Sequence, residues 1–296
     1  MRLPFAALLL FVPAVATAQT PEIDAAVKAK LVALKYVGSL QDAETGAFKA
    51  DAKAKPGLRA TSAAVRATKY LGGQVAHKDK IAEFVMKCYD PSTGAFADTP
   101  GGKADVPLTS VGVMAAVELD VPKTKFAKAL TYLKDNAKTF EDVRIGAAAV
   151  EAWCVKDCPF DLAPWIKIAD DFAAKELPDP KDGGARETGS VVAFYLRLGK
   201  ALPAGHTAEL VLNEGQRADG GWGKAGEKAS DLETTYRVMR AFYLLKTKPK
   251  NVAGLRDFLT ACHNTDGGTG AKAGDLSSTG GVYYSAIIQK WLSEIK

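Results

Sequence analysis

One short block recurs six times along this 296-residue chain: a helical stretch, a tight turn, and a second helical stretch. Successive turns lie about 37 to 48 residues apart, a period typical of helical-repeat proteins. Five turns begin with glycine and the third is degenerate. The turns are Gly46-Ala47-Phe48, Gly94-Ala95-Phe96, Thr139-Phe140-Glu141-Asp142, Gly183-Gly184-Ala185, Gly220-Gly221-Trp222 and Gly267-Gly268-Thr269. Because one such unit cannot bury its apolar face alone, the repeats must stack.

The first helix of each repeat has an amphipathic pattern. Ile81, Phe84, Val85 and Cys88 recur at three- and four-residue spacing with Lys and Glu between them, which predicts one buried face and one solvated face. We expect these outer helices at Ile23–Val37, Lys80–Cys88, Lys123–Leu133, Ala163–Lys175, Thr207–Gln216 and Val252–Cys262.

The second helices are more continuously small and apolar, as in Ile145 to Val150. This pattern predicts an inner layer that is covered on most sides. The expected ranges are Leu58–Leu71, Pro107–Leu119, Val143–Val155, Thr188–Leu198, Leu232–Leu245 and Ser278–Leu292. Several are expected to begin with a residue type that favours a helix start, namely Thr61, Thr109, Thr188, Asp231 and Ser277.

The last repeat, Leu276 to Leu292, is as apolar as the middle ones. An open solenoid would need polar capping repeats at its ends, whereas closure into a ring satisfies both ends. The sequence therefore predicts an all-α fold, an α/α toroid of six helical hairpins and about twelve helices, with an open solenoid as the alternative. We expect a single toroid domain over residues 19–296.

Residues 1–18 have the pattern of a signal peptide: a charge at Arg2, an apolar core from Phe5 to Val12, and a small-residue site ending at Ala18. We expect cleavage after Ala18 and export to the periplasm or the exterior, with a retained anchor as the alternative. The apolar core is too short for a helix of ~20 residues that spans a bilayer. The net charge of +5 is spread along the chain, so nucleic acid is not an expected partner.

The four cysteines are too few for a disulfide-dense scaffold. Cys154 and Cys158 are close enough in sequence for a local disulfide or a zinc half-site, although no second pair has metal-ligand spacing. Cys88 and Cys262 occupy equivalent positions in two repeats, and we expect both to be small buried apolar groups.

The Gln-x3-Gly-x-Trp motif of terpene cyclases is matched by Gln216, Gly220 and Trp222, and Gln41 to Phe48 resembles a variant one residue longer. The segments Asp219 to Tyr236 and Ser278 to Tyr284 are similar to β-subunits of protein prenyltransferases, notably the type II geranylgeranyl enzyme. The chain thus resembles the prenyltransferase/squalene-cyclase repeat superfamily. The resemblance implies an α/α toroid in which Gln216 and Trp222 tie one repeat to the next.

Protein prenyltransferases hold the acceptor thiolate on a zinc ion, with Asp, Cys and His ligands at inner-helix starts. The matching positions here hold Asp231, Glu233 and Ser278, so one of the three ligands remains. None of the three histidines, His77, His206 and His263, opens an inner helix. We therefore expect no zinc and no other cofactor.

Two kinds of enzyme remain as alternatives: an isoprenoid-acting enzyme, which is either a prenyl transferase or a terpene cyclase, and a polysaccharide-acting enzyme. An isoprenoid-acting enzyme would bind diphosphate through arginines, for which Arg237 and Arg240 are the best candidates and Arg144 and Arg186 the next. A terpene cyclase would use Asp231 and Glu233 as catalytic acids, although paired acids at a helix start more often cap the helix.

A polysaccharide-acting toroid enzyme needs an acid–base pair or a tyrosine site in its cavity. Its candidates here are Glu151, Glu187, Glu233, Tyr236, Tyr283 and Tyr284.

The leading hypothesis is an exported toroid that has lost zinc-dependent prenyl transfer and binds an apolar small molecule or a protein segment in its central funnel. The expected ligand-binding residues are Trp222, Tyr236, Arg237, Arg240, Ser278, Tyr283 and Tyr284. Whether the protein is catalytic stays open, because a fold alone does not define a reaction.

Overall fold

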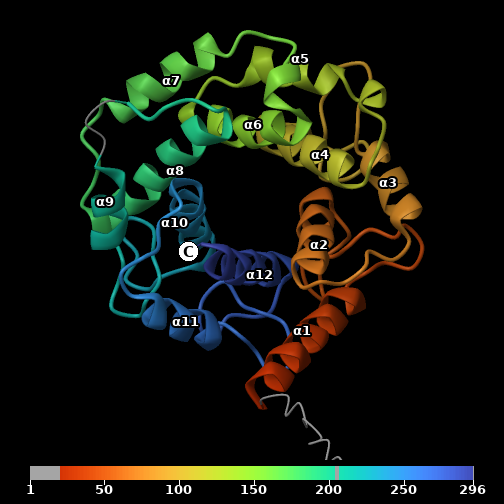
Figure 1. Ribbon diagram of the computed structural model, residues 1–296. Helices are drawn as coiled ribbons and strands as arrows, with labels where there is room; N and C mark the ends of the chain where they lie inside the picture. The colour runs from red at the N-terminus through yellow and green to blue at the C-terminus, as the bar shows by residue number, and fades with distance from the viewer. Residues whose placement is uncertain (1–20, 204–206, 296) are drawn as a thin grey trace, which may run out of the picture.

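The computed structural model describes residues 21–203 and 207–295, which form helical hairpins arranged in two concentric layers around a central axis (Figure 1). The expected signal peptide, residues 1–18, and His206 lie outside the described residues. Within the described ranges, no helix combines the length and apolar character that a membrane span requires.

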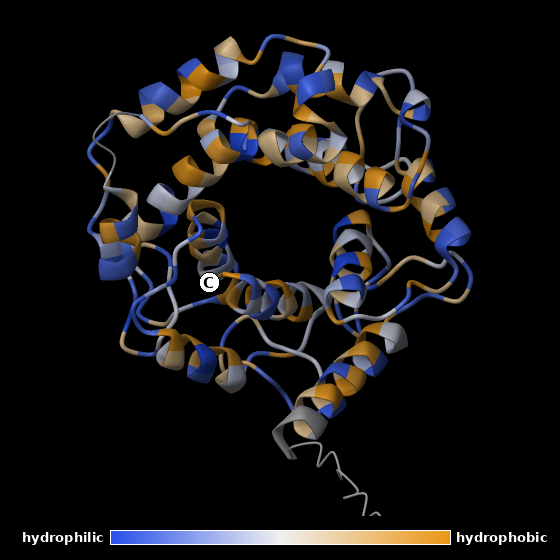
Figure 2. Cartoon of the chain, in the orientation of Figure 1, coloured by the Kyte–Doolittle hydropathy of each residue, from blue (hydrophilic) through white to orange (hydrophobic). Residues whose placement is uncertain are grey.

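The outer layer consists of α1 (Pro21–Ser39), α3 (Lys78–Lys87), α5 (Lys128–Asn136), α7 (Ala163–Ala173), α9 (Ala208–Glu214) and α11 (Val252–Ala261). Hydrophilic and hydrophobic residues alternate around these helices, as expected for amphipathic elements (Figure 2). The prediction of one continuous helix at Lys123–Leu133 is wrong about where the helix begins. A short 3-10 turn (Lys123–Lys125) precedes α5, and Phe126 between them buries its ring against Phe96 and Trp153.

The inner layer consists of α2 (Leu58–Tyr70), α4 (Val106–Glu118), α6 (Phe140–Trp153), α8 (Gly184–Arg197), α10 (Leu232–Leu245) and α12 (Thr279–Glu294). Each inner helix packs against the next, and α12 packs against α2. This last contact closes the ring (Figure 1). The all-α toroid with six hairpins is therefore confirmed, and the open solenoid is excluded.

A threonine in the first turn of three inner helices fixes the preceding glycine-aromatic turn. The hydroxyl oxygens of Thr61, Thr109 and Thr235 accept hydrogen bonds from the backbone N–H groups of Phe48, Phe96 and Trp222, at 2.9, 3.0 and 3.1 Å. Each bond spans 13 residues, so the same contact recurs in separate repeats.

Several predicted helix starts are corrected by this arrangement. The residues that precede α2 and α4 are Gly57 and Asp105, and Ser278 rather than Ser277 caps α12. Thr61 and Thr109 lie inside their helices, where their hydroxyl oxygens accept hydrogen bonds from the turn. Asp231 does cap α10, by accepting from the Thr234 N–H at 2.9 Å.

The Gln-Gly-Trp motif joins neighbouring repeats through its glutamine. The side-chain amide of Gln216 donates to the backbone oxygens of Gly220 at 2.8 Å and Asn251 at 2.9 Å, and Asn251 caps the outer helix of the next repeat. Gln41 makes the equivalent bonds to Gly46 and Ala76, at 3.0 and 3.4 Å.

Trp222 acts within its own repeat. Its indole is 1% exposed, packs against Phe242, and donates from Nε1 to the Leu212 oxygen at 2.8 Å. Gly220 has a φ of +89°, and a Cβ there would lie 1.9 Å from the Gly254 oxygen, so only glycine fits this approach.

The four cysteines are free thiols. Cys88 and Cys262 are buried, as predicted, and burial raises the pKa of each thiol to about 12. Oxidation of Cys154 and Cys158 to a local disulfide stays a prediction.

Candidate functional site

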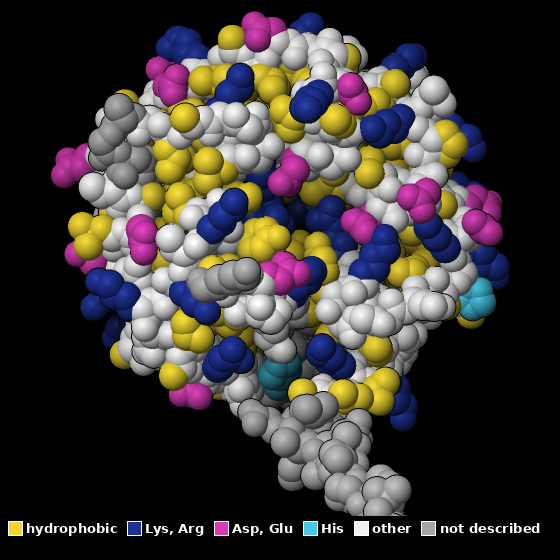
Figure 3. All heavy atoms as spheres, in the orientation of Figure 1, with side chains coloured by type: hydrophobic (Ala, Val, Ile, Leu, Met, Phe, Trp, Pro, Cys, Tyr) yellow, Lys and Arg dark blue, Asp and Glu magenta, His cyan; other side chains and the backbone are white. Residues whose placement is uncertain are grey.

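The inner helices surround a cavity of about 390 Å³ that opens as a central hollow in the surface (Figure 3). Its lining residues come mostly from the first half of α2, α4, α6, α10 and α12. The amino ends of these helices therefore face the same mouth. Because the amino end of a helix carries a partial positive charge, this arrangement favours a negatively charged ligand.

Five arginines line the cavity, and Figure 3 shows basic side chains inside the hollow with acidic side chains at its rim. The arginines are Arg59, Arg66, Arg144, Arg197 and Arg237. A second part of the wall is apolar and is made by Val111, Met114, Ile145 and Ala148. The funnel thus combines the apolar wall that the sequence predicts with a concentration of positive charge.

Glu141 bridges two of these arginines at the mouth. Its carboxylate accepts from Arg144 at 2.6 and 2.8 Å and from Arg237 at 2.9 and 3.1 Å. Burial alone would raise the pKa of Glu141, but the bonds and charges of the two guanidinium groups outweigh it and lower the pKa to about 2. Glu141 is therefore ionised at neutral pH.

Glu233 binds the same guanidinium group as Glu141. Nη2 of Arg237 donates a hydrogen bond to Oε1 of Glu233 at 2.8 Å. Lys224 pairs with the same carboxylate at 3.2 Å. Burial opposes ionisation here as well, but Arg237 and Lys224 lower the pKa of Glu233 below its ordinary value. Both carboxylates of the funnel are therefore acceptors and not proton donors.

Replacement of Glu141 by glutamine is expected to destabilise the fold at neutral pH by about 1–2 kcal/mol, because Arg144 and Arg237 keep their charges and lose a counterion. This estimate is below that for a fully buried pair, because the Glu141 side chain is 52% exposed. The pKa of Glu141 is lower in the folded state, so its contribution is complete above about pH 5 and is lost as the pH falls toward 2.

Urea unfolding of both proteins at several pH values would test this expectation. The difference in unfolding free energy should shrink as the pH falls from 5 to about 2. Glu227→Gln, which breaks an exposed pair with Lys272, should leave stability nearly unchanged. A difference for Glu141→Gln that does not depend on pH would contradict the role given to this carboxylate.

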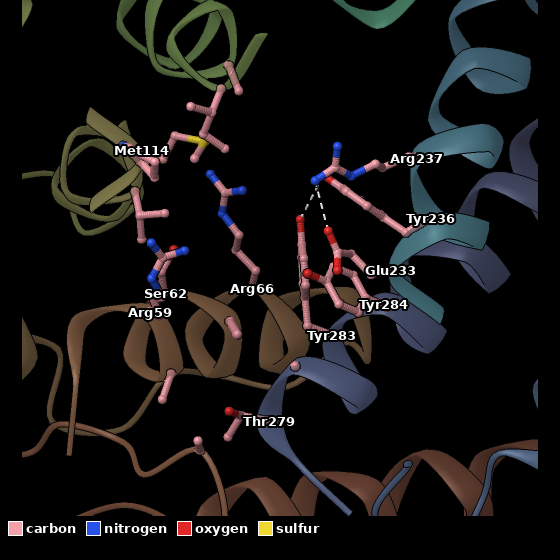
Figure 4. A pocket seen from close by; sticks show the side chains of 18 of the residues that line it. Arg59, Ser62, Arg66, Met114, Glu233, Tyr236, Arg237, Thr279, Tyr283 and Tyr284 are labelled. Atoms are coloured by element: carbon pink, nitrogen blue, oxygen red, sulfur yellow. Dashed lines mark hydrogen bonds and ion pairs between the residues drawn. The ribbon is translucent and has the colours of Figure 1, made fainter. Parts of the chain in front are cut away.

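Arg66 projects from α2 into the cavity, between Met114 on one side and Tyr283 on the other (Figure 4). Among the described residues, no carboxylate lies within ion-pair distance of its guanidinium group. Its Nε atom is buried and has no hydrogen-bond partner there. An unpaired guanidinium that faces a cavity is suited to bind an anionic ligand.

A cluster of aromatic rings forms the wall opposite Met114. The hydroxyl of Tyr283 donates to the hydroxyl oxygen of Tyr236 at 3.3 Å, and the Tyr284 ring lies 5.0 Å from that of Tyr236. Arg240 Nη2 donates to the Tyr236 oxygen at 3.5 Å, and its guanidinium carbon lies 4.5 Å from the centre of the Trp291 ring.

The structure brings most of the predicted site residues together. The cavity is lined by Glu233, Tyr236, Arg237, Ser278, Tyr283 and Tyr284. Arg240 borders a smaller adjoining cavity that Tyr236 and Arg237 also line. Trp222, by contrast, is buried in the protein interior and lies outside the lining.

Asp231 also lies outside the lining, and its two carboxylate oxygens accept from the N–H and hydroxyl of Thr234. Of the other carboxylate candidates, Glu151 pairs with Arg197 at 3.4 Å and Glu187 with Arg186 at 3.0 Å. The positions that match zinc ligands are thus occupied by a helix cap (Asp231), an ion-pair partner (Glu233) and a second cap (Ser278).

Sequence reasoning missed Arg59, Arg66, Glu141 and Arg197. A usable signal was present, because Arg66 and Arg197 lie far into inner helices that are otherwise small and apolar. A charged residue in such a position is costly unless it is paired or functional.

A closed ring of helical hairpins around a central cavity defines an α/α toroid. The chain belongs to the prenyltransferase alpha-alpha toroid domain family, whose model matches residues 9–152 and 185–293. A comparison with the sequences of curated proteins finds no match.

Similar solved structures include a wild-type glycosidase and two single-residue variants described as glycosidases. Each has a TM-score of 0.62 and is 13% identical in sequence. The alignments cover 94% of this chain and 100% of the other. At this identity the likeness describes the fold.

Proposed function

We propose that the central funnel binds an anionic ligand, and that this ligand is an acidic carbohydrate on which the protein acts as an enzyme. The observation that carries the proposal is Arg66, a guanidinium in the cavity with no carboxylate within ion-pair distance among the described residues. The converging amino ends of the inner helices add to the same positive potential.

Four considerations support a carbohydrate. Toroids of similar fold are glycosidases. The wall carries three tyrosines, whose rings and hydroxyls suit the apolar faces and hydroxyl groups of a sugar. A volume of about 390 Å³ lies in the range of small-ligand sites. Export, if the leader acts as expected, would place the protein where extracellular glycans are found.

A second candidate is an isoprenyl diphosphate, the ligand of the isoprenoid-acting alternative. The apolar wall of Val111, Met114 and Ile145 favours it, because such a wall could hold a hydrocarbon chain while the arginines hold the diphosphate. This candidate shares the anion site with the first and differs in what occupies the rest of the funnel. A protein segment is a further alternative.

Calorimetric titration of the purified protein with a matched pair of sugars tests the proposal. Oligogalacturonate should bind, and its fully methyl-esterified form, which lacks the charges, should bind much more weakly. Binding should also weaken as the salt concentration rises. Geranylgeranyl diphosphate is the probe for the second candidate. Oligoalginate and heparin fragments extend the panel of acidic sugars, and mass spectrometry of the mixtures would detect bond cleavage.

The outcomes separate the hypotheses. Equal binding of the acidic and esterified sugars would contradict the role of the arginines. Binding of geranylgeranyl diphosphate without binding of any acidic sugar would support the second candidate and overturn the first. Binding of acidic sugars without cleavage products would leave a carbohydrate-binding protein and overturn the enzymatic part.

A further inference from the structure

The funnel contains a hydroxyl in an unusual electrostatic setting. Tyr236 lines the main cavity and the smaller adjoining one. Its oxygen receives a hydrogen bond from Tyr283 at 3.3 Å and another from Arg240 at 3.5 Å. Its ring is stacked on that of Trp291, with the ring centres 5.5 Å apart. Two donors directed at one phenol oxygen stabilise negative charge on it.

Positive charge lies near Tyr236 on its own helix and on α2, α6 and α8, whereas α12 faces it with the rings of Tyr283, Tyr284 and Trp291. Arg240 lies one turn along its own helix, Arg197 comes from α8, and Arg144 from α6 borders the same small cavity. From α2, Arg66 and Tyr70 also face this cluster.

Two carboxylates near Tyr236 already form ion pairs with other basic side chains. Glu151 pairs with Arg197 at 3.4 Å, and Glu233 pairs with Arg237 and Lys224. The positive charge of Arg240 therefore has no carboxylate counterion among the described residues, and the oxygen of Tyr236 is the acceptor that it contacts.

We propose that Tyr236 is a phenolate at neutral pH and serves as the proton-accepting group of the funnel. The charges of Arg240 and Arg197 outweigh burial and lower the pKa of Tyr236 to about 6, whereas burial keeps the pKa of Tyr283 well above its ordinary value. The oxygen of Tyr236 is thus the acceptor of the pair, and the hydroxyl of Tyr283 is the donor.

The carboxylates of the funnel are weaker bases than a phenolate whose pKa lies near neutrality, because the pKa values of Glu141 and Glu233 are both lowered. They also do not form the pair used in glycoside hydrolysis by two carboxylates, in which one carboxylate is protonated at neutral pH. A group whose pKa lies near the working pH is the most effective general base. Tyr236 meets this condition and lines the cavity.

The step is a proton transfer coupled to bond exchange. When a water molecule attacks an electrophilic carbon of the ligand, its proton forms an O–H bond with Tyr236. The electron pair of the broken O–H bond of water stays on its oxygen as that oxygen forms the new C–O bond. The leaving oxygen departs with the electron pair of the bond that breaks. The phenol then returns its proton to the leaving oxygen through solvent.

The ionisation of Tyr236 can be tested without any ligand. Ultraviolet absorbance of tyrosinate in the full chain should rise by one tyrosine equivalent with a midpoint near pH 6. Tyr236→Phe should abolish this step. Tyr132→Phe, on the outer helix α5, should leave it intact. The absence of any tyrosine ionisation below about pH 8 in the unsubstituted protein would overturn the proposal.

Two further variants keep the test informative if Tyr236→Phe fails to fold. Arg240→Met removes the closest positive charge, and Tyr283→Phe removes a hydrogen-bond donor. Both should move the midpoint to higher pH. A midpoint that neither variant moves would assign the step to another tyrosine and overturn the proposal.

The catalytic role of Tyr236 rests on the proposed function, whereas its ionisation does not. With an acidic sugar that the protein cleaves, Tyr236→Phe should lower turnover roughly 100- to 10,000-fold. It should change KM little and remove the loss of activity below about pH 6. Full turnover in this variant would overturn the catalytic role, even if the ligand binds as proposed.

Discussion

Replacement of Arg66 by methionine should lower the affinity of the funnel for oligogalacturonate roughly 10- to 100-fold. The reason is that a bond between a guanidinium and an anionic group contributes about 1.5–3 kcal/mol. Arg66 has no competing carboxylate in the described structure, so the ligand would gain most of this interaction. Methionine keeps much of the side-chain length and removes the charge. Calorimetric titration of both proteins measures the difference directly.

The same substitution should leave the fold at least as stable as before. The Arg66 guanidinium forms no ion pair with a carboxylate of the described residues, and its burial costs desolvation free energy, so its removal is expected to be neutral or stabilising. Arg256→Met, on the exposed face of α11, is the matched control because it makes the same charge change far from the funnel. Undiminished affinity in the Arg66 variant, or an equal loss in the Arg256 variant, would contradict a specific anion site.

Replacement of Trp222 by alanine should destabilise the protein by about 3–5 kcal/mol, as expected for deletion of a fully buried aromatic side chain. The indole is 1% exposed, packs against Phe242, and donates a hydrogen bond to Leu212. Its loss would leave a large cavity between α9 and α10 and an unpaired backbone oxygen. Urea unfolding monitored by circular dichroism gives the free energy.

Trp222→Phe separates the two contributions. Phenylalanine retains most of the apolar volume and loses the indole N–H, so the expected cost is about 1–2 kcal/mol. If alanine costs no more than phenylalanine, the packing explanation is wrong. Because Trp222 lies outside the cavity lining, folded protein of either variant should still bind the ligand.

The fold could be predicted from the sequence because the repeat makes one signal occur several times. The second helix of the fourth repeat was expected at Thr188–Leu198 and is α8, Gly184–Arg197. The third outer helix was predicted less well. Burial of the Phe126 ring between Phe96 and Trp153 decides where that helix begins, and these partners lie far away in the sequence.

The site could be predicted only where a motif marks it. Glu233, Tyr236 and Tyr283 lie at inner-helix starts beside recognisable turns, and all three line the cavity. Arg66 lies in the middle of a helix without a motif, and its position in the cavity depends on the packing of α2 between α4 and α12. The ionisation of Tyr236 depends on Arg197 from a separate repeat, so spacing along the chain does not reveal it.

The contact between α12 and α2 has a consequence for how the molecule unfolds. A linear array of repeats can fray from either end, one unit at a time, because each unit touches only its neighbours. In this ring every inner helix has two inner neighbours, so no repeat can separate without breaking two interfaces at once. Unfolding should therefore be cooperative across the whole circle, and removal of one hairpin would take away the partner of two others.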